Sequence, residues 1–261
     1  MHVRAVETER ESRLSRFGRL TRRAAAIALL SWPLLAASSG GALHGQAQIL
    51  DAHTPLANLD TRAGLVQPTA AQKSIVNGLG ASVRWNRFGT PASLVKHGGY
   101  LATGLTGDAV TGARRFVRQN RALFRLSDQA VTNLELVSDS RMAGNQIHAV
   151  IFRQRYGSLA AGHDGLITVG IVGGKVGYVS SSATGDAAAP GGASLTPKQA
   201  WIKAAQSVGK NVATAAVNVG GTDDGWTLLD VNGFSFDQRA RLVAVPTPKN
   251  GVRPAFETLV L

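Results

Sequence analysis

The chain has 261 residues, of which 44% are hydrophobic and 6% aromatic, and its formal net charge is +12. This length allows one large or two small domains, and the hydrophobic content is ordinary for a globular protein. The lack of cysteine excludes disulfide bonds and thiolate metal sites, and scattered Lys and Arg residues without a nucleic-acid motif predict that the charge does not serve nucleic-acid binding.

Residues 1–47 have the layout of a secretory signal peptide. A basic stretch, residues 1–23, precedes a largely apolar run, residues 24–37, and small residues follow. This run is shorter than the roughly 20 apolar residues of a membrane span, so we expect cleavage after Ala47 and a secreted, extracellular chain without membrane attachment. An uncleaved N-terminal anchor is the alternative, and Arg22-Arg23 raises a twin-arginine export route. The segment holds seven Arg and three Glu, so its removal leaves 12 − 4 = +8.

A helix is expected in the middle of the chain, after two irregular regions. Residues 48–81 show no strong periodicity and are expected to form an extended arm, and Gly and Pro punctuate residues 83–107, where we expect loops with short strands. Asp108 then suits the N-cap of a helix. The apolar residues that follow recur at intervals of three and four positions and predict one buried face: Ala109, Val110, Ala113, Phe116, Val117 and Phe124.

Four arginines are expected on the opposite side of this helix: Arg114, Arg118, Arg121 and Arg125. We interpret this arginine stripe as a solvated helix face. Binding of an acidic surface is the alternative interpretation.

Antiparallel strands are expected next, at residues 133–139 and, after a turn at Gly144-Asn145, at residues 146–156. Alternation with a period of two places four side chains of the second strand on one face: Val150, Phe152, Gln154 and Tyr156. Residues 163–172 and 175–182 are expected to form a hairpin, because both positions of Gly173-Gly174 accept positive φ.

A second, smaller unit is expected after a Gly- and Ala-rich linker at residues 185–193. Thr196-Pro197 predicts the start of a helix that ends at Gly209, with a buried face of Trp201, Ala204, Ala205 and Val208. A Gly- and Asp-rich loop with Trp226 and Leu228 follows, and then strands at 240–245 and 253–260. The expected fold is therefore α+β, with two small subdomains that each pack one helix on an antiparallel sheet.

No catalytic constellation is visible in the sequence. A zinc peptidase needs two His four positions apart on a helix with a neighbouring Glu, and the six histidines, at positions 2, 44, 53, 97, 148 and 163, include no such pair. His148 and His163 could meet across strands but have no evident third ligand. Asp223-Asp224 lies in a Gly-rich stretch, and no Gly-x-Ser-x-Gly motif occurs. We therefore expect no catalytic residue, no metal site and no cofactor, and so no enzyme activity in this chain.

Three groups of residues carry a family resemblance. The helix and its exit, Arg115-Phe116-Val117 with Ala122-Leu123-Phe124-x-Leu126-Ser127, and the strand Val150-x-Phe152-x-Gln154-x-Tyr156 resemble the FTP (fungalysin/thermolysin propeptide) domain of secreted zinc metallopeptidases. The family usually continues with Gly-Ile-Pro-Val, where this chain has Ser158-Leu159-Ala160-Ala161. Leu195-Thr196-Pro197 to Gly209 is similar to a PepSY-like unit, and residues 245–256 resemble the strand pair before the fungalysin catalytic domain.

The resemblance implies an FTP-like domain at residues 82–185 and a PepSY-like subdomain at 194–261, whose end inside an apolar strand suggests a truncated precursor. It also implies a role. Such proregions inhibit the cognate metallopeptidase catalytic domain, in the same precursor or in trans, and assist its folding as chaperones. The alternative is a free-standing secreted protein-binding module without peptidase function.

Overall fold

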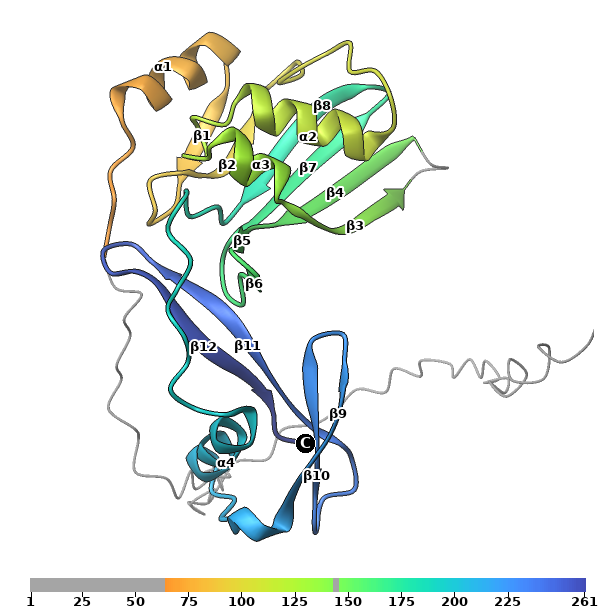
Figure 1. The fold of residues 1–261 in the computed structure, drawn as a ribbon. Helices are drawn as coiled ribbons and strands as arrows, with labels where there is room; N and C mark the ends of the chain where they lie inside the picture. The colour runs from red at the N-terminus through yellow and green to blue at the C-terminus, as the bar shows by residue number, and fades with distance from the viewer. Residues whose placement is uncertain (1–63, 143–145) are drawn as a thin grey trace, which may run out of the picture. The chain divides into compact units, whose positions relative to one another are not determined.

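The computed structural model describes residues 64–142 and 146–261 (Figure 1). The expected signal peptide, the first part of the expected arm and the expected turn at Gly144-Asn145 lie outside these residues. The helices of the described part are α1 (Ala70–Leu79), α2 (Ala109–Gln119), α3 (Asp128–Thr132), α4 (Pro197–Ser207) and the 3-10 turn η1 (Thr214–Ala216). Among the described residues, no helix has the length and apolar character needed to cross a membrane.

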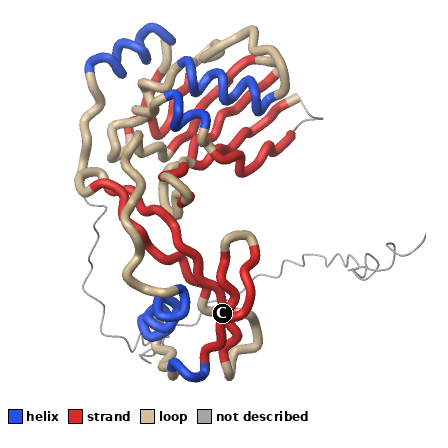
Figure 2. Tube along the Cα trace, in the orientation of Figure 1, coloured by secondary structure: helices blue, strands red, loops and turns tan. Residues whose placement is uncertain are grey.

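Two antiparallel sheets, apart from a two-stranded pair, organise the described chain (Figure 2). The first has the order β1-β2-β8-β7-β4-β3 and the second the order β12-β11-β10-β9. Strands of the first sheet are β1 (Ser82–Trp85), β2 (Pro91–Val95), β3 (Glu135–Met142), β4 (Ile147–Arg153), β7 (Leu166–Val172) and β8 (Lys175–Ser181). Strands of the second are β9 (Val217–Asp223), β10 (Trp226–Val231), β11 (Gln238–Thr247) and β12 (Gly251–Leu259), and the pair is β5 (Arg155–Tyr156) with β6 (Leu159–Ala160). Helices and antiparallel strands in separate layers make this an α+β fold, as expected.

The expected extended arm is wrong for residues 70–79, which form α1. Thr69 and Gln72 make a reciprocal capping box at its start, and Gly80 ends it at a φ of 61°. Buried Gln72 donates through Nε2 to the carbonyls of Gly89 (2.8 Å) and Leu123 (2.7 Å). The helix lacks a continuous apolar stripe because one of its two buried residues is this polar anchor, so periodicity did not reveal it.

The core of the first sheet lies under α2 and α3, which cross one face of the sheet (Figure 1). Asp108 caps α2 as expected, and its carboxylate accepts from the Thr111 N–H at 2.6 Å. Phe116 of α2 and the expected strand face of Val150 and Phe152 are fully buried. Phe124 is also fully buried, but it belongs to a turn, because α2 ends at Gln119.

Arg118 and Arg121 of the arginine stripe are solvated, as interpreted, whereas Arg114 and Arg125 bond to backbone carbonyls within the fold. The Arg114 guanidinium donates to the carbonyls of Val131 (2.7 Å) and Leu134 (2.9 Å) at the end of α3, and it stacks on Phe152 with 4.6 Å to the ring centroid. Burial, followed by the nearby Arg118, lowers the pKa of Arg114 from its ordinary value. Arg118 and Arg121 are about half exposed and pair loosely with Asp128, and Arg125 donates to the Gln67 carbonyl. Partners far away in sequence therefore place Arg114 and Arg125.

The second sheet is covered by α4, which begins at Thr196-Pro197 with a capping box to Gln199. Trp201 is fully buried; its Nε1–H donates to the Leu259 carbonyl at 2.8 Å, and its ring meets that of Phe234 edge-on at 5.5 Å. Ala205 is also buried, whereas Val208, expected on the buried face, is 53% exposed at the C-cap.

One further expectation about the second unit is wrong. The expected loop around Trp226 is the β9–β10 hairpin, whose turn uses positive φ at Asp224 (45°) and Gly225 (77°). It was missed because only Val217 of β9 is buried, so the strand shows no apolar alternation. The strands expected at 240–245 and 253–260 are confirmed as β11 and β12; β11 extends further at both ends and includes Pro246, and β12 begins earlier, at Gly251.

Subdomain composition also differs from the expectation of one helix each, since three described helices belong to the first sheet. Residues 182–193 have no regular structure, as expected of a linker. Ala161 forms a single parallel bridge to Ala244 of β11, where Gly162 N–H donates to the Ala244 carbonyl at 2.9 Å. The Ala244 carbonyl thus points away from β12, so its neighbour Pro254 also directs its nitrogen away from β11.

Candidate binding surface

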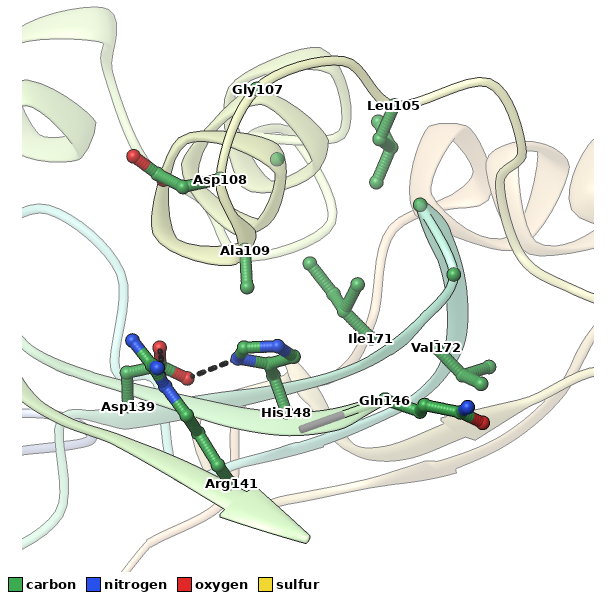
Figure 3. Close-up of a pocket in the computed structure, with 13 residues that line it drawn as sticks. Leu105, Gly107, Asp108, Ala109, Asp139, Arg141, Gln146, His148, Ile171 and Val172 are labelled. Carbon is green, nitrogen blue, oxygen red and sulfur yellow. Dashed lines mark hydrogen bonds and ion pairs between the residues drawn. The ribbon is translucent and has the colours of Figure 1, made fainter. Parts of the chain in front are cut away.

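A pocket of about 480 Å³ lies at the N-terminal end of α2 (Figure 3). The start of α2 and the preceding loop form one wall with Leu105, Asp108 and Ala109, and the ends of β3, β4 and β7 form the other. In Figure 3, Leu105, Ala109 and Ile171 surround the space above the His148 ring, and Arg141 and Gln146 lie at its mouth. An apolar interior with a polar mouth suits an aliphatic side chain.

The strand register explains why these residues meet. Arg141 pairs with His148, and His148 pairs with Ile171, so one row crosses β3, β4 and β7. His148 precedes buried Val150 by two positions and therefore shares the helix-covered face of the sheet. The row combines segments that are 30 residues apart in sequence, and for that reason no local motif revealed it.

The polar groups of the pocket are largely bonded to one another. His148 Nδ1 lies 2.8 Å from Asp139 Oδ1, and Arg141 Nε lies 3.5 Å from Asp139 Oδ2. The Asp108 carboxylate caps α2, and the backbone hydrogen bond from Thr111 lowers its pKa, so it is ionised at neutral pH. The N-terminal end of α2 is therefore already occupied by an anion of the protein itself. No hydroxyl or thiol side chain belongs to the pocket lining of the described chain.

The residues weighed for metal binding or catalysis lie apart. His148 is in this pocket, whereas His163 precedes β7 and lies 3.7 Å from Asp164. Asp223 and Asp224 form the tip of the β9–β10 hairpin, where Asp223 pairs with Arg239 at 3.5 Å. Within residues 64–142 and 146–261, no three His, Asp or Glu side chains come together in a way that could hold a metal ion.

Among residues 64–142 and 146–261, no strand pairs with the outer edge of β3, which lies beside the pocket and is called the free edge below. Gln154 N–H donates to the Gly165 carbonyl, so the Gln154 backbone faces the β7 side, and so do those of Phe152, Val150 and His148. The alternate residues Ile151, Ala149 and Ile147 must then bond to their β3 partners Ser138, Ser140 and Met142. The backbone groups of Asp139 and Arg141 consequently point outward from the sheet.

This free edge is also partly apolar. Leu136 is 45% exposed, Val137 42% and Met142 51%. A strand added at β3 would bond to Asp139 and Arg141, and its side chains opposite these residues would share their face, next to the pocket. The edge and the pocket thus form one candidate binding surface. No protein-family model matches the chain, and no curated protein matches it.

Proposed function

We propose that this chain is the proregion of a secreted zinc metallopeptidase, exported by its N-terminal segment, that inhibits the catalytic domain and assists its folding. The observation that carries the proposal is the free edge of β3 beside the pocket at the start of α2. This surface is built to hold an extended segment of another protein.

Strand addition gives the proposed binding its geometry. The outward backbone groups of Asp139 and Arg141 would pair with an extended segment of the peptidase, and one side chain of that segment would enter the pocket between Ala109 and Ile171. Main-chain hydrogen bonds supply affinity in this mode, and the pocket supplies selectivity. The sheet is already ordered by its buried core, so binding costs little conformational entropy on the proregion side.

The residues that resemble the FTP family pack in the core or hold the chain by hydrogen bonds in this fold, which supports the proposal. Phe116, Leu123, Phe124 and Phe152 are fully buried in the first core. Buried Gln154 accepts from the Thr184 N–H at 2.8 Å and donates to the Gly185 carbonyl at 3.1 Å, and the Tyr156 hydroxyl bonds to Thr184. Gln154 and Tyr156 therefore hold the start of the linker in place by hydrogen bonds.

A free-standing secreted binding module is the second candidate, and the same edge and pocket favour it equally. The partner separates the two candidates. A proregion must act on a zinc metallopeptidase, whereas a free-standing module would bind some other extended segment.

The decisive experiment mixes the chain with the zinc metallopeptidase catalytic domain encoded in the same precursor or beside it. We expect inhibition of peptide hydrolysis and a higher yield of active enzyme on refolding. Arg141→Pro should weaken inhibition roughly tenfold or more, because proline removes an outward N–H without breaking the ladder to β4.

Arg141→Ala is the matched control, since it removes the side chain and keeps the N–H, and it should inhibit nearly as well as the wild type. Inhibition by Arg141→Pro equal to that of the wild type would show that β3 is not the contact. If the wild-type chain neither inhibits the peptidase nor assists its refolding, the proregion proposal is wrong and the free-standing binding module remains.

A further inference from the structure

In the part of the chain that the structure describes, no helix covers the second face of the first sheet. The pair register defines two rows of side chains on this face, and each row crosses all six strands. One row is Arg84, Ser93, Ser180, Thr168, Ile151 and Ser138. The other is Ser82, Val95, Tyr178, Gly170, Ala149 and Ser140. We name these two rows the open face.

The open face is depleted of charge. Arg84, on the outermost strand, is the only charged residue in the two rows, although 17% of the chain is charged. Ser, Thr, Ala and Gly dominate the rows, so the surface is low in relief. Exposed apolar residues flank them on the same face, with Ile147 36% and Leu166 38% exposed. A surface held in water alone gains nothing from the loss of charge, whereas the centres of protein interfaces are typically depleted of it.

Tyr178 is the largest side chain of the open face, and the sequence around it fixes its position. A Cβ added at its cross-strand partner Gly170 would lie 2.2 Å from Tyr178 Cε1 and 2.4 Å from Cδ1. The ring therefore covers the β7 backbone at Gly170, where any other residue would displace it. Tyr178 is nevertheless 41% exposed. Tyrosine is one of the residue types that most often carry the binding energy of protein interfaces.

Basic residues border the open face. Arg84 lies at one end of a row, Lys175 pairs with Val172 at the hairpin, and Arg153 lies opposite Leu166. Two acidic residues lie near this border: Glu135 is 3.9 Å from Arg153 and 2.7 Å from Arg155, and Asp224 lines the same hollow as these two arginines. The border is thus net positive, and so is the chain without its first 47 residues, at 12 − 4 = +8. A second copy would bring like charges together, whereas an acidic surface would be attracted.

We infer that the open face docks a folded partner that presents an uncharged apolar patch bordered by carboxylates, with Tyr178 as the anchor. The inference rests on the proposed function, under which this partner is the peptidase catalytic domain. It assigns to the domain a second contact, separate from the strand edge of β3. The uncharged residues of the two rows supply the desolvated centre of this contact. Arg84, at the outer end of one row, supplies its complementary border together with Arg153 and Lys175.

The test measures association and dissociation rates of the chain with the same catalytic domain. Thr168→Arg places a charge in the centre of the open face, and Tyr178→Ala removes the anchor. Both should weaken binding at least roughly tenfold, chiefly through faster dissociation. Arg84→Glu should instead slow association, and the effect should shrink as salt rises.

Gln119→Arg is the matched control, because it adds the same charge at an exposed position of α2, and it should bind as the wild type does. Thermal melting of each variant separates lost binding from lost folding. If Thr168→Arg and Tyr178→Ala fold well and bind with wild-type affinity while Arg141→Pro binds poorly, the open face is not a docking surface. The proposed function would then still stand. No binding by the wild type would overturn both.

Discussion

Each of the two sheets has helices packed on one face, but the two cores differ in size and in composition. The first core draws buried residues from α1, α2, α3 and strands of its six-stranded sheet, and Phe116, Phe124 and Phe152 share its centre. The second core is smaller and gathers around one side chain, Trp201 of α4, with Leu229 and Val217 beneath it. Because the first core joins α1, α2 and α3 to its sheet, a cavity there should weaken the whole first unit, whereas a cavity in the smaller second core should open that core locally. The comparison predicts different responses to truncation.

The largest effect is expected for Phe152→Ala in the first core. Phe152 is fully buried and carries the Arg114 guanidinium on its ring. Truncation should lower the free energy of unfolding by about 3–5 kcal/mol, and some further loss comes from the cation–π contact. Chemical denaturation measures this change. A midpoint equal to that of the wild type would place Phe152 outside the core.

A slightly smaller loss, about 3 kcal/mol, is expected for Trp201→Ala, and it should be local. The substitution removes the edge contact with Phe234 and leaves the Leu259 carbonyl without its indole donor. Hydrogen exchange should quicken in β10 and β11 and stay slow in β4 and β7. An equal increase of the hydrogen-exchange rate in both sheets would show that the two cores unfold as one unit, contrary to this prediction.

The smallest of the three effects concerns pH at Tyr156, which belongs to neither large core. Burial raises the pKa of Tyr156 to about 12, whereas a tyrosine in an unfolded chain ionises near 10. The raised pKa contributes stability that is complete below pH 10 and is lost as the pH rises through 12. The expected loss is about 2–3 kcal/mol. Tyr156→Phe should remove most of this alkaline decline in denaturation profiles; an unchanged decline would contradict the assignment.

Local signals in the sequence predicted local structure well. Asp108 and Thr196 cap their helices as expected, and Gly173-Gly174 closes the expected hairpin with φ of 52° and 70°. The alternation from Val150 to Tyr156 correctly predicted a buried face. These features depend on neighbours within a few residues, so composition and spacing are sufficient to predict them.

What the sequence did not predict depends on distant partners. α1 is anchored through Gln72 to Leu123, 51 positions away, and Arg114 is placed by the end of α3. The pocket at α2 and the open face, whose two rows hold Arg84 as their one charged residue, can be recognised only when the strand register is known. A period of two tells which residues share a face of one strand, but it does not tell which strands lie side by side.

Pro254 affects how readily a strand of another molecule can pair with the second sheet. Pro254 lies on β12, the outer strand of the second sheet, and directs a nitrogen without hydrogen away from β11. A strand arriving there would find a missing donor in the middle of the ladder, which protects that edge against fibril-like stacking of chains. Strand β3 contains no proline and keeps its donors. Strand addition is therefore disfavoured at β12, whereas β3 keeps its backbone donors.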